Sequence, residues 1–149
     1  MTTIQDLLTL RNLVMFTGLL HFCQVPALFF APRMLDWEKD FSKLRLINRR
    51  IFQVIGGAIV LTVLGLGVVV VVASDEIVQG GRLGLSLVCF LGLFWAYRCA
   101  IQVLLYARIW PEGWLARLSH YGLTALFTFL SGSYLVVFVL ILLRTTVAE

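Results

Sequence analysis

Four long apolar segments dominate the sequence, at residues 13–31, 51–73, 83–106 and 121–143. The hydrocarbon core of a bilayer is about 30 Å thick and needs about 20 helical residues at 1.5 Å each. Each segment meets that length, and none shows the strict alternation of a transmembrane strand. The sequence therefore predicts an all-α integral membrane protein, with four transmembrane helices packed as a bundle.

Composition supports the same class. Of the 149 residues, 60% are hydrophobic and 13% are charged, whereas soluble domains carry about 25% charged residues. Residues 1–149 are expected to form a single transmembrane domain. The sequence has no pattern typical of a cleaved signal peptide, so the first apolar segment is expected to stay as a permanent span.

Orientation is predicted from the lysines and arginines that flank the spans. The first and third loops carry eight of them, and the opposite side carries three. This bias predicts cytoplasmic first and third loops and external termini, in a plasma or inner membrane. It also predicts anionic lipid, rather than nucleic acid, as the partner of the basic loops. The eight are Arg33, Lys39, Lys43, Arg45, Arg49, Arg50, Arg108 and Arg117; the three are Arg11, Arg82 and Arg144.

The first loop has a pattern of its own. Met34, Trp37, Phe41, Leu44 and Ile51 recur at helical spacing, and charged residues mostly fill the rest of each turn. This pattern predicts a short amphipathic helix that lies in the cytoplasmic interface of the membrane.

The first and third spans resemble each other. Residues 13–19 match residues 87–93 at five of seven positions, and Gln24-Val25 has a counterpart in Gln102-Val103. The match indicates two helical hairpins repeated in parallel, related by an axis along the membrane normal. Chance similarity between apolar segments is the alternative.

Arg98 is the most informative single residue. A charge near mid-membrane costs about 2.5 to 3.5 kcal/mol on insertion scales. No predicted span contains an acidic residue that could pair with it. Its partner must therefore be a carbonyl, water, a lipid phosphate, a ligand or another subunit, unless the side chain extends to the interface.

Three further polar residues are expected near the depth of Arg98. His21 and Gln24 share one face of the first span, and Gln102 lies one turn beyond Arg98. Because the first and third spans cross the membrane in the same direction, these four residues form a candidate ligand-binding group. The alternative is polar contact between helices, worth about 0.6 kcal/mol each.

Small residues on the third span predict close helix packing. Gly92, Ala96 and Ala100 form a small-xxx-small stripe, on roughly the opposite face from Arg98. One face of this helix favours close packing and the opposite face carries a charge that needs a partner. We therefore expect the third span to be contacted on both sides.

Catalytic and metal-binding patterns are missing from the sequence. It has no zinc spacing, phosphate loop or Ser-His-Asp pattern, and three cysteines do not suggest a disulfide framework. A haem held by both His21 and His120 is disfavoured, because their depths differ by about 15 Å. We therefore predict no catalytic residue and no metal site, and assign no cofactor.

Two functions remain open on these observations. The first is a small, non-enzymatic subunit that packs with other membrane chains or with copies of itself. The second is a ligand-binding or redox protein that holds a quinone, a lipid or a haem near His21 and Arg98. Transport is a third function and is disfavoured, because four helices alone offer little room for a pathway.

Overall fold

The computed structural model describes residues 4–147, and within them all regular structure is helical. Four helical segments are long and apolar enough to cross a membrane: Leu7–Met34, Leu46–Val72, Arg82–Arg108 and Trp114–Thr146. The prediction of an integral membrane protein with four spanning helices is therefore confirmed at this level. Each segment contains one predicted span, except that the second segment ends at Val72, one residue before the end of its predicted span. At all other ends the helix extends beyond the predicted span, because polar flanking residues continue it.

The first span is built from three consecutive helical pieces. Helix α1 (Ile4–Leu20) passes into the 3-10 turn η1 (His21–Gln24), which is followed by α2 (Val25–Met34). Pro26 is the second residue of α2 and has no N–H to donate to the preceding turn. The change of helix type therefore falls in the turn that precedes the proline, at the depth where His21 and Gln24 lie.

The loop after α2 contains less helix than its pattern predicts. Helix α3 covers only Trp37–Ser42, because Asp36 adopts a left-handed conformation (φ 51°) and α4 (Leu46–Val72) begins soon afterwards. The rings of Phe41 and Phe52 stack with centroids 6.0 Å apart, which ties α3 to the first turns of α4. The position of α3 at a membrane interface stays a prediction.

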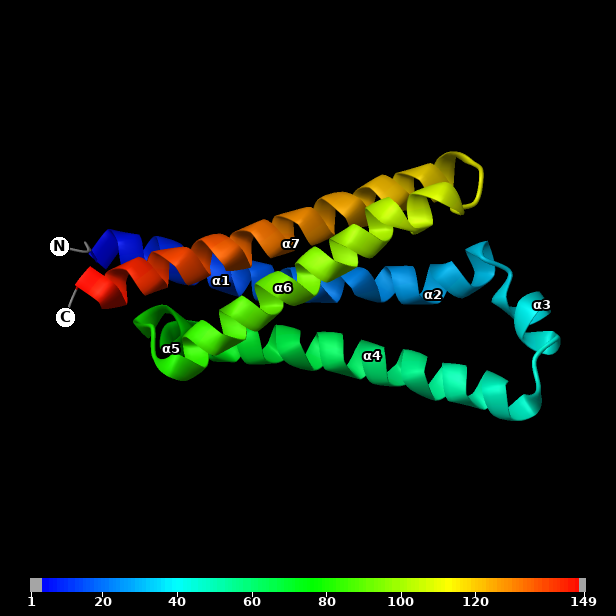
Figure 1. Ribbon diagram of the computed structural model, residues 1–149, viewed down its shortest axis with the longest axis horizontal. Helices are drawn as coiled ribbons and strands as arrows, with labels where there is room; N and C mark the ends of the chain where they lie inside the picture. Colours follow the sequence, from blue (N-terminus) through cyan, green and yellow to red (C-terminus); the bar gives the residue numbers. More distant parts are fainter. Residues whose placement is uncertain (1–3, 148–149) are drawn as a thin grey trace.

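The second half of the chain forms a hairpin. After the short helix α5 (Ser74–Gln79), α6 (Arg82–Leu104) leads through the 3-10 turn η2 (Tyr106–Arg108) to α7 (Trp114–Val147). Figure 1 shows α3 and the α6–α7 connection at one end of the molecule, hereafter the basic end. Helix α5, the start of α1 and the end of α7 lie at the other, hereafter the terminal end.

The best-packed part of the molecule lies between α1, α6 and α7. Val14, Leu91, Trp95, Leu130 and Tyr134 are completely buried there. On the α7 side of α6, a Cβ added at Gly92 would lie 2.7 Å from a Leu135 methyl, and Ser131 Oγ donates to the Gly92 carbonyl at 3.1 Å. Gly92, in the predicted small-residue stripe, therefore packs against α7. Trp95 lies between His21 of η1 and Phe127 of α7. Arg98 lies over the Phe127 ring and also lines a cavity with residues of α4.

Helices α1 and α4 cross where two glycines meet. A Cβ added at Gly67 would lie 2.9 Å from His21 Cβ and 3.1 Å from the Gly18 carbonyl oxygen. One added at Gly18 would lie 2.8 Å from Val71. The two backbones can approach this closely only because both positions lack a side chain.

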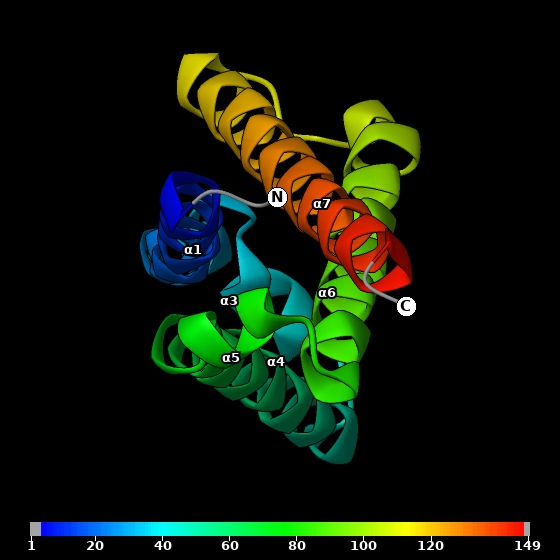
Figure 2. The ribbon, with the colours of Figure 1, turned by 90° about the vertical axis from the view of Figure 1, so that its left-hand side faces the viewer.

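The basic-end half of α4 stands apart from the other helices. Figures 1 and 2 show α2 and α4 diverging toward the basic end, so the molecule has the form of a fork. Residues 51–59 of α4 are exposed throughout. Helices α6 and α7, by contrast, are linked toward this end by the 2.9 Å contact of Gln102 with His120, although Figure 2 shows that the two helices cross and that their ends lie apart at the connection. The two hairpins therefore differ in packing, and the internal repeat stays a prediction.

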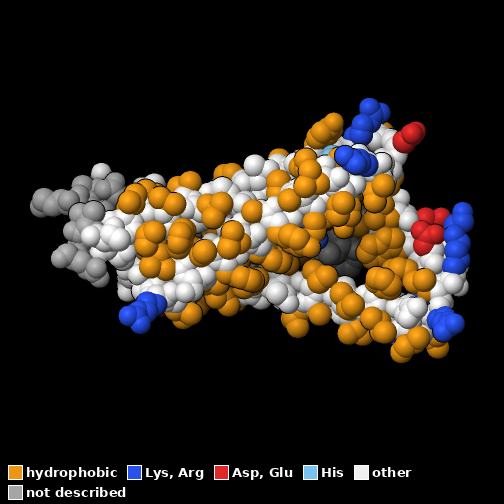
Figure 3. Space-filling model, in the orientation of Figure 1, with side chains coloured by type: hydrophobic (Ala, Val, Ile, Leu, Met, Phe, Trp, Pro, Cys, Tyr) orange, Lys and Arg blue, Asp and Glu red, His pale blue; other side chains and the backbone are white. Residues whose placement is uncertain are grey.

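The surface agrees with a membrane setting. In Figure 3, hydrophobic side chains cover the long flank of the molecule, and the charged side chains on this face gather at its ends. Exposed apolar residues of this extent are unfavourable in water and expected in lipid.

Candidate functional site

His21 lies at the centre of the packed region, completely buried, with both ring nitrogens engaged. Trp95 Nε1 donates to His21 Nε2 at 3.3 Å, and His21 Nδ1 lies 2.9 Å from the Thr17 carbonyl oxygen. An indole nitrogen can only donate, so Nε2 accepts and Nδ1 carries the proton. The ring also makes an edge contact with Trp95 at 5.1 Å. His21 is therefore a neutral side chain that joins α1 to α6, with no free lone pair for a ligand.

Arg98 lies one turn from Trp95 on α6 and is only partly buried. Its guanidinium carbon lies 5.4 Å from the ring centroid of Phe127, which is itself stacked on Trp95. A cation placed over an aromatic face gains about 0.5 to 2 kcal/mol. Among the described residues, no carboxylate pairs with this guanidinium and no hydrogen bond to it is formed. Its donors are therefore available to another molecule.

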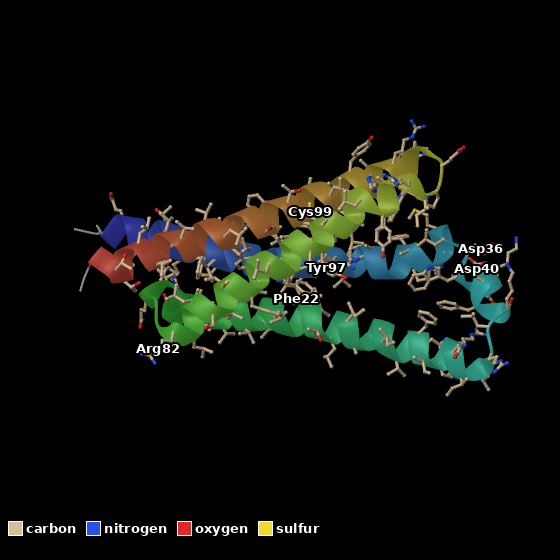
Figure 4. All side chains as sticks on the ribbon, viewed as in Figure 1. Phe22, Asp36, Asp40, Arg82, Tyr97 and Cys99 are labelled. Carbon is tan, nitrogen blue, oxygen red and sulfur yellow. The ribbon has the colours of Figure 1, made fainter. Side chains whose placement is uncertain are left out.

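A cavity of about 240 Å³ connects these residues. It lies at the base of the fork, between η1, α4 and α6, and Figure 4 shows Tyr97 and Phe22 in the space between α6 and α4. The lining residues are His21, Gln24, Val25, Ile59, Val60, Val63, Leu64, Phe94, Tyr97 and Arg98.

Gln24 supplies a second available donor to this cavity. Its side-chain nitrogen is buried and has no hydrogen-bond partner among the described residues. A buried amide without a partner costs roughly 1 to 3 kcal/mol, so its occurrence calls for an explanation. A bound acceptor would satisfy both Gln24 and Arg98.

The structure brings three of the four predicted site residues together and separates the fourth. Gln102 is buried toward the basic end, where its amide nitrogen lies 2.9 Å from His120 Nδ1. The Trp110 ring lies 5.4 Å from that of His120. The sequence carries a signal for this pair, because Gln102 and His120 are equidistant from Pro111 in an antiparallel hairpin. The resemblance between the first and third spans does not reveal it, because His120 belongs to the fourth.

The chemistry available in the cavity is hydrogen-bond donation. Arg98 and Gln24 provide N–H groups, Tyr97 adds a hydroxyl, and the carbon surface of α4 closes the other side. No cluster of three or more potential metal ligands from histidine, cysteine, aspartate and glutamate occurs in residues 4–147. This arrangement suits recognition of an acceptor-bearing group and includes no general base or nucleophile activated by a neighbour.

Comparison of the chain with protein-family models, with curated proteins and with solved structures finds no match.

Proposed function

We propose that this integral membrane protein binds a lipophilic molecule whose head group carries hydrogen-bond acceptors, in the cavity between η1, α4 and α6. The observation that carries the proposal is the pair of unpartnered donors, Arg98 and Gln24, on one small cavity. Five N–H donors of an arginine cannot be removed by deprotonation, so they require acceptors wherever water is scarce.

The head group is expected to be a carboxylate or a quinone-type carbonyl. Both present acceptors to the guanidinium fork, and a carboxylate would also neutralise its charge. The tail is expected to lie along α4, because Ile59, Val60, Val63 and Leu64 line that side of the cavity. Such a ligand would reach the site from the bilayer along the exposed side of α4.

Binding of two probes tests this proposal. We expect purified protein in nanodiscs to bind oleate, a decyl-tailed benzoquinone, or both, and Arg98→Gln to weaken binding by about 10- to 100-fold. That range follows from about 1.5 to 3 kcal/mol for a hydrogen bond to a charged group. Comparing the two probes distinguishes a carboxylate head from a carbonyl head. Arg98→Lys should restore only part of the affinity, because an ammonium lacks the planar fork.

The matched control is Arg82→Gln, at the terminal end of the same helix, where Figure 4 shows the side chain far from the cavity. It should bind both probes as the wild type does. Gln24→Leu should weaken binding while leaving insertion and helix content unchanged. Equal binding by wild type and Arg98→Gln would contradict the proposal.

A second candidate is a non-enzymatic subunit, favoured by the exposed half of α4. Gly56, Gly57 and Gly65 have no other atom within 4 Å of an added Cβ, so this helix offers a smooth surface for close packing. We place this function second because lipid tails alone can cover an apolar helix, whereas they offer no acceptor to the buried Gln24 nitrogen or to the Arg98 guanidinium. The partner would be a second copy of the chain or another membrane protein.

Crosslinking tests the subunit function. With Cys23, Cys89 and Cys99 replaced by serine, Gly57→Cys should form disulfide-linked dimers or adducts in native membranes. Val139→Cys, on the exposed face of α7, is the matched control and should stay uncrosslinked. If the two variants crosslink to the same extent, no protein partner packs specifically on α4, and lipid covers its exposed face.

We also propose the orientation that the basic residues predict, with the basic end in the cytoplasm. In the same cysteine-free background, Ser42→Cys at the end of α3 should be labelled only after the membrane is permeabilised. Gln79→Cys at the end of α5 should be labelled from outside. Both side chains are exposed. The reverse labelling would overturn the orientation, and labelling of both from one side would overturn the number of spans.

A further inference from the structure

A second and larger groove lies on the other side of α2, away from the Arg98 cavity. It has a volume of about 810 Å³ and runs between α2 and the first part of α7, with the Trp110 ring as part of its wall. The indole is held in place by a 2.7 Å hydrogen bond to the Ala116 carbonyl oxygen. Except at its basic end, the groove is lined almost entirely by carbon.

The length of this groove matches one leaflet of a bilayer. Its wall on η1 and α2 extends from Cys23 to Arg33, which is about 15 Å at the helical rise. Half of a hydrocarbon core of about 30 Å has the same length. A single acyl chain standing along α2 would therefore fill the groove from the middle of the membrane to its surface.

The positive charge at the basic end of the groove favours a lipid with an anionic head group. Arg33 lines the basic end, is exposed, and has no ion pair among the described residues. Ser119 lies on the opposite wall. The only ion pair near this end in residues 4–147 joins Lys43 to Asp40. The eight lysines and arginines of this end outnumber its four acidic residues, so it carries a net positive charge.

We propose that the groove between α2 and α7 is a specific site for an anionic phospholipid, with one acyl chain along α2 and the phosphate bound by Arg33. The site is separate from the Arg98 cavity and does not depend on the function proposed for it. Arginine binds phosphate oxygens in a bidentate manner, which explains why the charged residue stands where the apolar wall ends.

Two glycines of α7 allow a matched test. Gly122 lines the groove, and Gly132 lies ten residues further along the same helix, outside it. An added Cβ meets no other atom within 4 Å at either position. Gly122→Leu therefore fills the groove without a backbone clash, and Gly132→Leu makes the same change elsewhere.

The experiment is native mass spectrometry of protein reconstituted in vesicles of equal parts phosphatidylglycerol and phosphatidylcholine. Wild type should retain one phosphatidylglycerol in preference to phosphatidylcholine. Gly122→Leu should lose this lipid, Gly132→Leu should keep it, and Arg33→Gln should weaken its retention by at least about tenfold. Arg98→Gln should leave it unchanged, which separates this site from the other cavity. Ala31→Leu, which fills the groove from α2, provides a second variant if Gly122→Leu folds poorly.

Three results would overturn the proposal. The first is equal retention of both lipids by the wild type, and the second is unchanged retention in Gly122→Leu and Ala31→Leu. The third is a dimer of the wild type that Gly122→Leu abolishes, because the groove would then hold a second copy of the chain.

Discussion

Trp95→Ala is expected to destabilise the fold by about 3 kcal/mol or more, the range typical of deleting a buried tryptophan. The side chain is completely buried, stacks on Phe127 at 5.4 Å and makes an edge contact with Phe94 at 5.0 Å. Its loss also removes the donor to His21 Nε2. Within a membrane the penalty comes mainly from lost packing and an unsatisfied nitrogen, rather than from transfer out of water.

Thermal unfolding in mild detergent, followed by circular dichroism, measures this effect. The control is Trp114→Ala, at a side chain that is 75% exposed, which should change stability by less than about 0.5 kcal/mol. If the two variants unfold alike, the packing described around His21 is wrong.

Gly67→Ala is expected to separate α1 from α4 and to cost about 1 to 3 kcal/mol, the usual range for overpacking. The new methyl group would lie 2.9 Å from His21 Cβ and 3.1 Å from the Gly18 carbonyl oxygen, and neither atom is at the end of a flexible chain. Gly67→Leu should have a larger effect. The measurement is a disulfide crosslink between cysteines introduced in α1 and α4 near the crossing, together with the unfolding temperature.

Gly65→Ala is the control for this prediction, two residues away on the same helix. No atom lies within 4 Å of an added Cβ there, and alanine is the better helix former by about 1 kcal/mol. Gly65→Ala should therefore be neutral or stabilising. A loss of stability in Gly65→Ala equal to that in Gly67→Ala would indicate that helix flexibility, rather than close contact, explains the glycine.

The spans could be predicted from the sequence because the thickness of a bilayer fixes the length of apolar sequence that it needs. The local change at His21–Gln24 also follows from Pro26, whose missing N–H requires an adjustment in the preceding turn. The extent of α3 could not be predicted from periodicity. Its start depends on the left-handed conformation of Asp36, a residue that the hydrophobic pattern does not distinguish from its charged neighbours.

The depth of each candidate site residue in the membrane could be predicted, but the direction in which its side chain points could not. Helical rise gives the depth of a residue, so His21, Gln24 and Arg98 could be grouped before their surroundings were known. The rotation of each helix depends on side-chain packing with its neighbours, which the sequence of one chain does not specify. In the structure the Gln102 side chain contacts His120 rather than the other three residues. The ring nitrogens of His21, which were expected to contact a ligand, form hydrogen bonds with Thr17 and Trp95 instead.

The attachment of α4 at one end has a mechanical consequence. From Gly67, where α4 crosses α1, to Leu46 at its start, the helix extends for about 30 Å, and residues 51–59 are exposed. A rigid rod held near one end converts small angles into large displacements. Rotation of α4 by about 10° around the glycine crossing would move Leu46 by about 5 Å, as follows from that length. It would move Ile59, about 12 Å from the crossing, by about 2 Å. The same rotation would widen or narrow the cavity beside Arg98. A lipid or protein that binds the exposed half of α4 would therefore change the size of this cavity.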